Sequence, residues 1–465
     1  MIRDRESYNI TGMIPGEEPE QMIMLSAHYD SYFTGFQDDN AAVAMMLGIA
    51  RTFIDMGYKP RKTLVFCAMA AEEWGVVDSK YDWSTGAYEQ VFTAHPEWQG
   101  KVIADFNFEL PAHAHGKKDA VRCTYEYASF MKKATEHIQP SKEAYPEGLE
   151  VHFPIQTWSD DFSIAIAGIP SSVNEFSDGE FMETHYHSQF DNEDFYDEPV
   201  YRFHHNLYGK LVLAFDHTAV VPMDFERLFA AVEDSVEKAL CEKTQANETN
   251  LLERLKKAKE LGHQLYDQIQ KINETYKNLL EAGKYEEAKA MAAEYAALNS
   301  SLLYIFRKEQ DYFVRLNWHD DVLFPQQGVG ENLKVIYKAL GCLKEDDPEG
   351  ALEAVYEIDN NRYAFLFDRE VFRYFTEYVL NQPADRLKWG YGRIIHHENL
   401  YDLVVSLKEK NKLQKAGERP DLEEEYKILL QAANAQEQCY RDDIDYMASS
   451  VEKLLAAMEG CVQKQ

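Results

Sequence analysis

A change of pattern near Pro222 divides the chain into two halves that should fold differently. Before it, apolar runs typical of strands alternate with helix-like stretches. After it, the sequence is almost entirely helical in character. Strands that alternate with helices are typical of an α/β protein. We therefore predict a three-layer sandwich with a mixed, mostly parallel central sheet over residues 1–220, followed by an all-α part.

The first half contains several segments with a clear periodicity. Apolar runs bounded by turn residues predict strands at 8–13, 22–27, 63–69 and 101–108, with a further short strand after Pro170. Helical spacing of apolar residues predicts helices at 40–56, 125–137 and 200–220.

The second half repeats apolar residues at alternating intervals of three and four. A first seam consists of Leu251, Leu255, Ala258, Gly262, Leu265, Ile269, Ile272, Tyr276 and Leu279. A second seam runs from Ala288 to Ile305, after a break around Gly283. Two such helices joined by a short turn predict a long antiparallel hairpin with coiled-coil packing. Further helices are expected at about 349–381 and 420–459.

Composition limits the possible partners. The 465 residues include 48 Lys and Arg against 80 Asp and Glu, a formal net charge of −32. Such a charge argues against nucleic acid or an anionic membrane as a partner.

The cysteines and the apolar runs indicate the kind of compartment. Because the six cysteines are scattered along the sequence, we expect them to be free thiols and not a disulfide framework. With neither a membrane-spanning run nor a signal-like amino terminus in the sequence, a cytoplasmic protein is the default expectation.

The strand at 63–69 ends in two adjacent carboxylates, Glu72 and Glu73. Carboxylates after a buried strand are costly unless a positive group meets them. Neighbouring side chains diverge on an extended backbone, so two that face one site imply a turn. One could then bind a metal while the other transfers a proton. A solvated acidic loop is the alternative interpretation.

Other chemically active residues also follow strand-like segments. Ligand sites in open α/β sheets gather at the carboxyl ends of the strands. A two-metal site needs a shared carboxylate, further nitrogen and oxygen ligands, and one free carboxylate to activate water. Taken alone, the acidic loop before the 40–56 helix is better explained by Asp39 or Asn40 as a simple N-cap of that helix. In chain order, the residues that together predict a two-metal site are His28 with Asp30, Asp39 in the acidic loop before the 40–56 helix, Glu72 with Glu73, Glu109, and Tyr186 with His187.

Six motifs occur in an order that resembles a known family. The chain is similar to the di-zinc exopeptidases that include bacterial leucyl aminopeptidases, glutamate carboxypeptidase II and the transferrin receptor. The resemblance covers about residues 8–220. It is carried by HYDS, DDNAAVA, PRKTLVFCAMAAEEWGVVDS, FNFE, WSDDFSIAIAGIPSS and YHSQFD.

The resemblance implies a role for each site residue. It makes Asp39 the ligand that bridges two zinc ions, with Co²⁺ or Mn²⁺ as alternatives. Glu73 and His187 would complete one zinc site, and His28 and Glu109 the other. The family usually has Asp at the position of Glu109, and Asp105 is the competing candidate.

The same resemblance assigns the remaining roles. Glu72 becomes the general base and Tyr186 a donor to the oxyanion. Asp30 becomes the partner of His28, and Asp191 also lies behind the ligands.

The remaining histidines are expected to be structural. His113 and His115 fall in a polar loop beyond a strand, and His185 is expected to line the pocket. His204 and His205 fall in the helix that closes the first half, where a packed or exposed position is expected.

The resemblance continues more weakly beyond Pro222. Residues 221–227 and 327–340 resemble the helical dimerisation domain of the transferrin-receptor-like members. A peptidase domain is therefore expected at 1–220, a dimerisation domain at 221–350 and a helical extension at 351–465. A twofold homodimer is implied. Because the chain begins almost at the first catalytic strand, an amino-terminal part is expected to be missing.

These observations predict a metal-dependent exopeptidase that hydrolyses a terminal peptide bond. An acidic pocket and the segment from His187 to Asp191 favour an aminopeptidase. The alternatives are a carboxypeptidase, a non-catalytic receptor on the same fold, and a scaffold whose function lies in residues 223–465.

Overall fold

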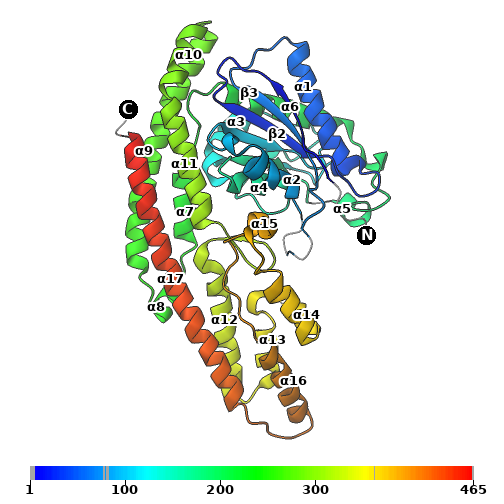
Figure 1. Ribbon diagram of the computed structural model, residues 1–465, viewed down its shortest axis with the longest axis vertical. Coiled ribbons are helices and arrows are strands. Elements are labelled where there is room, and N and C mark those ends of the chain that lie inside the picture. Colours follow the sequence, from blue (N-terminus) through cyan, green and yellow to red (C-terminus); the bar gives the residue numbers. More distant parts are fainter. Residues whose placement is uncertain (1–5, 77–78, 80–82, 178, 361, 463–465) are drawn as a thin grey trace.

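A seven-stranded mixed sheet forms the centre of the first half (Figure 1). The computed structural model describes residues 6–76, 79, 83–177, 179–360 and 362–462. The strand order is β1-β3-β2-β4-β7-β5-β6. The strands are β1 (Ile10–Ile14), β2 (Met22–His28), β3 (Thr63–Met69), β4 (Val102–Asn107), β5 (Asp119–Cys123), β6 (Leu149–His152) and β7 (Ser171–Asn174).

Parallel pairing dominates the sheet, and the predicted mixed topology is confirmed. β2 lies between β3 and β4 and is parallel to both, and β7 continues the parallel set beside β4. β1 pairs antiparallel with β3, and β5 pairs antiparallel with β7. The strands expected at 22–27, 63–69 and 101–108 are present. β5 and β6 were not predicted, because their short runs carry charged residues and lack a clear alternation.

Helices cover both faces of the sheet, which confirms the three-layer sandwich. Alternate side chains of β2 enter different cores: Ile23 and Leu25 pack with the helices on one face, and Met22 and Met24 with those on the other. The first face is covered by α1 (Ala42–Asp55), α3 (Ala128–Thr135) and α6 (Glu198–Asp216), and the second by α2 (Thr85–Glu89) and α4 (Asp160–Ile166). The short α5 (Glu180–Thr184) precedes α6.

The second half is a large helical region, as predicted. Figure 1 shows part of this half standing beside the sheet domain and the rest extending below it. They are α7 (Glu226–Asp234), α8 (Lys238–Thr244), α9 (Glu248–Glu281), α10 (Tyr285–Glu294), α11 (Ala296–Phe313), α12 (Pro325–Lys344), α13 (Pro348–Val355), α14 (Arg369–Arg373), α15 (Ala384–Leu387), α16 (Tyr401–Lys415) and α17 (Glu423–Val462), with the small hairpin β8 (Arg315–Leu316) and β9 (Val322–Leu323) between α11 and α12.

Two details of the helical half differ from the prediction. The buried seam of α9 differs at two positions, where Asn273 and Leu280 are buried in place of the expected Ile272 and Leu279. The helix expected over 349–381 is broken into α13, α14 and single turns. Asp359, in one of these turns, has a left-handed backbone with φ of 57°, and a helix cannot continue through that conformation.

The hydrophobic core does not stop at the junction between the halves. One continuous cluster of buried apolar side chains includes Leu25 in the sheet, Phe215 in α6, Leu265 in α9, Phe306 in α11 and Met458 in α17. The long α9 also packs along α17, α7 and α10. The first face of the sheet domain is therefore buried partly by its own helices and partly by the helical half.

Two buried asparagines fasten the connecting segment 219–221 to the long helices. The Asn273 side-chain oxygen accepts hydrogen bonds from the backbone N–H groups of Ala219 and Val220, and its amide donates to the Val220 carbonyl. Asn299 does the same for the Val221 N–H and the Ala219 carbonyl. Each side chain thus satisfies backbone groups that have been removed from water.

Replacing Asn273 with alanine is expected to lower the free energy of unfolding by about 2–4 kcal/mol, because it leaves three buried backbone groups without partners. Urea unfolding followed by circular dichroism measures this change. Asn278→Ala, on an exposed face of the same helix, is the matched control and should change the stability by less than about 0.5 kcal/mol. Equal effects of the two substitutions would contradict the view that the hydrogen bonds of Asn273 to segment 219–221 stabilise the fold.

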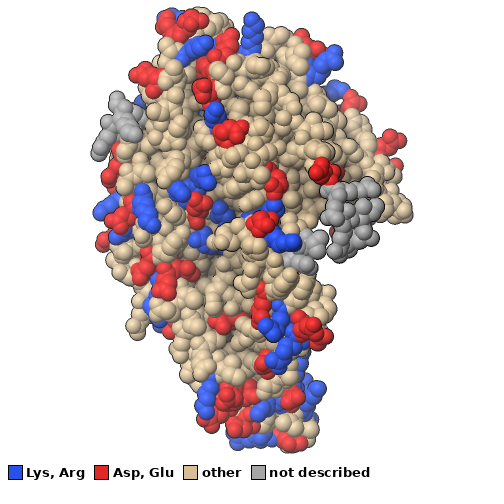
Figure 2. All heavy atoms as spheres, viewed as in Figure 1, with Lys and Arg blue, Asp and Glu red and all other residues tan. Residues whose placement is uncertain are grey.

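Charged side chains of both signs are intermixed over the face of the molecule shown in Figure 2. In the described part of the chain, no disulfide bond joins any of the six cysteines. Among the described helices, none is both long enough and apolar enough to cross a bilayer.

Candidate metal centre

The predicted site residues meet at the carboxyl ends of the three central strands. His28 is the last residue of β2. Glu72 and Glu73 follow β3, and Glu109 follows β4. His187 comes from the turn after α5 and has a left-handed backbone with φ of 54°. Since β3, β2 and β4 are parallel neighbours, their ends present these side chains at one edge of the sheet.

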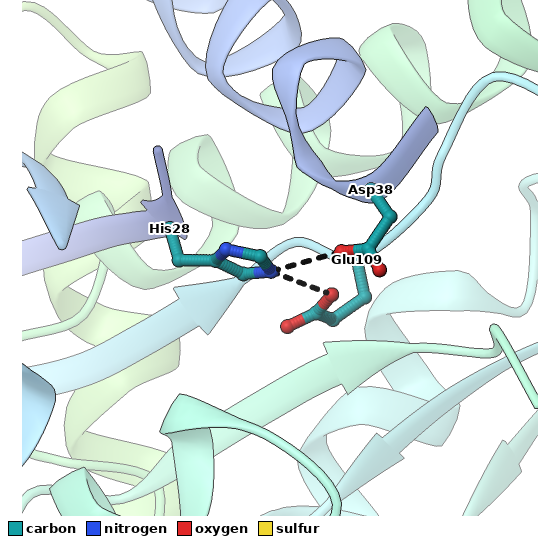
Figure 3. Close-up of side chains that lie close together, drawn as sticks. All are labelled: His28, Asp38 and Glu109. Atoms are coloured by element: carbon teal, nitrogen blue, oxygen red, sulfur yellow. Dashed lines mark ion pairs between the residues drawn. The ribbon is translucent and has the colours of Figure 1, made fainter. Parts of the chain in front are cut away.

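Carboxylates converge on one nitrogen of the buried His28 side chain. The Nε2 atom lies 3.1 Å from Asp38 Oδ1 and 3.6 Å from Glu109 Oε2, as Figure 3 shows. Asp39 Oδ2 and Glu72 Oε2 are at 3.9 and 4.0 Å from the same atom. The other ring nitrogen, Nδ1, is 2.9 Å from the backbone carbonyl oxygen of Asp30. This contact orients the ring so that Nε2 points into the cluster.

Asp38, and not Asp39, lies between the two histidines. Asp38 Oδ1 faces His28, and Asp38 Oδ2 is 3.3 Å from His187 Nε2, which also lies 3.1 Å from Glu73 Oε2. Three groupings can therefore hold a metal ion: His28 with Asp38 and Glu109, His28 with Glu72 and Glu73, and Asp38 with Glu73 and His187. Asp38 therefore occupies the place between the two histidines where Asp39 was expected.

The backbone before α1 explains which acid points inward. The Asp191 carboxylate accepts hydrogen bonds from the N–H groups of Gln37 and Asp38, at 2.9 and 3.1 Å, and so fixes this turn. Asp39 is directed to the neighbouring loop, where its Oδ1 accepts a hydrogen bond from the Leu110 N–H. Asp39 therefore braces the segment that carries Glu109, and Asp191 positions Asp38.

Glu109 is the acid of β4 that reaches the cluster, and the competing Asp105 does not. Asp105 lies inside the strand and accepts a hydrogen bond from the Ser26 hydroxyl at 2.9 Å. Glu109 is held by two residues that the sequence analysis did not assign: Ser159 donates to its Oε1, and Asn174 accepts from its backbone N–H at 2.9 Å. Ser159 is also the N-cap of α4. A serine before two aspartates is a recognisable N-cap signal, but nothing in it reveals the second contact.

Asp30 holds the two glutamates that follow β3. Its two carboxylate oxygens accept hydrogen bonds from the backbone N–H groups of Glu72 and Glu73, at 3.1 and 3.2 Å. One aspartate therefore ties the orientation of His28 to the turn that carries both glutamates.

The electrostatics of the cluster are those of a site with too much negative charge. Burial raises the pKa of Glu72 well above its usual value. Burial together with the charge of Glu109 raises the pKa of Asp39 well above its usual value. Burial acts to lower the pKa of His28, but the charges of Glu109 and Asp39 outweigh it and raise the pKa well above its usual value. Burial also opposes a rise at His187, yet hydrogen bonds to Asp38 and Glu73 raise its pKa to about 9.

The donor set fits divalent metal ions. Buried carboxylates at this density are stable only when positive charge compensates them. Within the described part of the chain, Asp39 Oδ2 and Glu73 Oε1 are buried without a hydrogen-bond partner. Two imidazole nitrogens with surrounding carboxylates are ligands that suit zinc, cobalt or manganese.

A cavity of about 430 Å³ adjoins the cluster. Glu72, Glu73 and His187 lie on one side of it, and Asp320 and Asp321, from the turn between β8 and β9, lie on another. The Tyr186 ring also lines the cavity and stacks on His187 with a centroid distance of 3.7 Å. Among the described residues that line this cavity, none is lysine or arginine. Both halves of the chain therefore shape an acidic pocket.

The remaining histidines stand outside the metal-binding groups that the described residues form. The rings of His113 and His115 contact each other in the loop after β4, with their centroids 3.9 Å apart and their planes tilted by 47°. His185 packs against Phe195 at 4.6 Å and is not among the residues that line the cavity, contrary to expectation. His204 is buried in α6, beside Asp119.

The mixed sheet carries a candidate metal centre, made of two histidines and several carboxylates, at the ends of its central strands. Residues 9–212 match the model of peptidase family M28, and this part of the chain is therefore similar to that family.

Individual proteins show similarity over parts of the chain. A probable glutamate carboxypeptidase VP8 of Zea mays is 23% identical over 54% of this chain and 36% of its own length. Transferrin receptor protein 1 of Gallus gallus is 33% identical over 18% of this chain and 12% of its own length. A solved zinc aminopeptidase of Bacillus subtilis, BSAP, aligns with 20% identity over 44% of this chain and 49% of its own, with a TM-score of 0.35. The chain thus matches only about a third, or less, of these curated relatives.

Proposed function

We propose that this protein is a co-catalytic, two-zinc exopeptidase that removes one residue from the end of a peptide. The observation that carries the proposal is the position of Asp38, which faces His28 with one oxygen and His187 with the other. His28 and Glu109 would hold one ion, Glu73 and His187 the other, and Asp38 both. When bound, such ions supply Lewis-acid chemistry, which polarises a carbonyl group and lowers the pKa of water.

The protein's own groups would carry out the proton transfers. Glu72 lies beside the cluster, and its raised pKa suits a group that accepts a proton from water and returns it to the leaving amine. Tyr186, which lines the same cavity, would donate a hydrogen bond to the oxygen of the attacked carbonyl. Asp30 and Asp191 keep the ligands and Glu72 in position through the hydrogen bonds described above.

The acidic cavity favours an aminopeptidase. The free amino terminus of a peptide is an ammonium ion, and Asp320 and Asp321 add negative charge to the pocket that would receive it. A carboxypeptidase would need a cation for the substrate carboxylate. It remains the second candidate because the Zea mays relative is called a probable glutamate carboxypeptidase. A non-catalytic receptor is disfavoured by the complete set of ligands.

Metal analysis combined with a substrate panel tests the proposal. We expect about two zinc ions per chain and hydrolysis of aminoacyl p-nitroanilides. Hydrolysis should stop after treatment with a chelator and return when zinc is added. Turnover confined to substrates with a free carboxyl terminus would support the carboxypeptidase instead. Absence of turnover on both kinds of substrate, with zinc bound, would refute the exopeptidase.

We also propose that residues 221–350 form a homodimerisation domain. The basis is the resemblance of residues 221–227 and 327–340 to the transferrin-receptor-like proteins. Light scattering of the full chain should give twice the mass of one chain, and a monomer at micromolar concentration would refute the proposal.

A further inference from the structure

A second cavity, of about 500 Å³, lies between the sheet domain and the helical half. It is bordered by the single turn η4 (Tyr125–Tyr127) and by α4, α7 and α11. Ile155 and Gln156 line this cavity, whereas the next two residues, Thr157 and Trp158, line the catalytic one. The two cavities are thus neighbours separated by one segment of chain, and the second contains none of the residues assigned to the metal centre.

Two buried glutamates line the second cavity side by side. Glu126 from η4 is 1% exposed, and Glu309 from α11 is 0% exposed. The two carboxyl groups lie within reach of each other, and that of Glu126 also within reach of the Thr124 hydroxyl, but in the described part of the chain no positively charged side chain hydrogen-bonds to them. Burial raises the pKa of Glu126 to about 7, and burial with the charge of Glu126 raises the pKa of Glu309 well above its usual value. Two buried acids side by side cost stability unless a cation joins them.

The other walls of the cavity are aromatic. The Tyr125 ring lies 5.8 Å from Phe153 and 6.2 Å from Phe324, and Phe324 lies 6.4 Å from Phe313. All four side chains line the cavity, and an exposed acid, Asp234, stands among the lining residues. None of the described lining residues is lysine, arginine or histidine. The cavity therefore offers negative charge and aromatic faces, and its described lining supplies no positive partner.

We propose that this cavity is a binding site for a primary organic ammonium ion with an apolar, aromatic body. The three N–H donors of the ammonium group would meet the oxygens of Glu126 and Glu309. The body would pack against Phe153, Phe313 and Phe324, and the rings would stabilise the charge through cation–π contact. A bare Ca²⁺ or Mg²⁺ ion fits less well, because it requires about six or more oxygen ligands and this wall is mostly carbon.

Calorimetric titration of the full chain with tryptamine tests the proposal. Tryptophol, which has a hydroxyl in place of the ammonium, is the matched neutral ligand. We expect tryptamine to bind, and Glu309→Gln and Glu126→Gln each to weaken that binding by about tenfold or more, since each removes a charged acceptor. Glu425→Gln, which removes a buried carboxylate from α17, should leave the affinity unchanged.

The variants also separate this site from the acidic catalytic cavity. Tryptamine held at the metal centre would bind Glu309→Gln and the original protein equally, and that result would overturn the proposal. Equal affinity for tryptophol, or saturation by Ca²⁺ or Mg²⁺ in place of tryptamine, would also overturn it.

Folding of the variants can be checked independently. Glu309→Gln keeps the shape of the side chain and removes a carboxyl group whose ionised form burial disfavours, so its melting temperature should equal or exceed that of the original protein. Ala231→Phe fills the cavity from the α7 wall without changing either acid. It should abolish tryptamine binding, and unchanged binding would refute this location.

Discussion

Replacing Glu72 with glutamine is expected to lower kcat for peptide hydrolysis by about 10²–10⁴-fold, because the amide cannot accept the proton that a general base removes from water. The metal should remain bound. Glu72 Oε2 lies 4.0 Å from His28 Nε2, farther than the oxygens of Asp38 and Glu109. Steady-state kinetics on an aminoacyl p-nitroanilide, together with elemental analysis of the same sample, measures both quantities.

Glu183→Gln provides the matched control for this substitution. Glu183 is an exposed acid on α5, three residues before Tyr186, so the variant has the same change of charge close to the site and should keep normal turnover. If Glu72→Gln also kept near-normal turnover, Glu72 would not be the base. If it lost turnover together with the metal, Glu72 would instead act as a ligand, which the grouping of His28, Glu72 and Glu73 allows.

Replacing Asp38 with asparagine is expected to reduce the bound metal from two ions to roughly one or fewer per chain, and to lower kcat/KM by about 10²-fold or more. Asp38 is the carboxylate that faces both histidines, so neutralising it removes an anionic ligand from two sites at once. Elemental analysis after dialysis against zinc-free buffer measures the loss.

The neighbouring acid provides the comparison. Asp39→Asn keeps an oxygen that can accept the hydrogen bond from the Leu110 N–H, so this variant should retain about two metal ions. A reversed result, with metal lost from the Asp39 variant and kept by the Asp38 variant, would restore the assignment of Asp39 as the bridge.

Sequence patterns predicted the sheet domain well because its central strands are apolar and bounded by turn residues. The strand predicted at 63–69 matches β3, and the acids that follow it lie where parallel strands end. The order of the motifs then brought together His28, Glu73, Glu109 and His187, which the structure places around one cluster.

The choice between Asp38 and Asp39 could not be made from local pattern. Adjacent side chains point in different directions, and which one points inward depends on backbone dihedrals that are set from a distance. Asp191, far along the chain, fixes those dihedrals by holding the N–H groups of Gln37 and Asp38. Ser159 escaped notice for the same reason, since its bond to Glu109 joins elements remote in sequence.

The helical half shows a similar limit. Three-four spacing located α9 within three residues at each end, but it placed Ile272 and Leu279 in the buried seam. Asn273 is buried in their place because the backbone of segment 219–221 needs its hydrogen bonds. Polarity alone marks an asparagine as exposed, so a pattern of apolar residues cannot identify it as a core position.

The apolar cluster that runs from Leu25 through Phe215 to Leu265 and Phe306 limits how the two halves of this protein can be separated in evolution. A descendant that lost everything after residue 220 would expose a large apolar surface to water and would tend to aggregate. Shorter proteins built on the same sheet must therefore have a water-tolerant surface on that flank. In this lineage, the sheet domain and the helical half are expected to be retained or lost together.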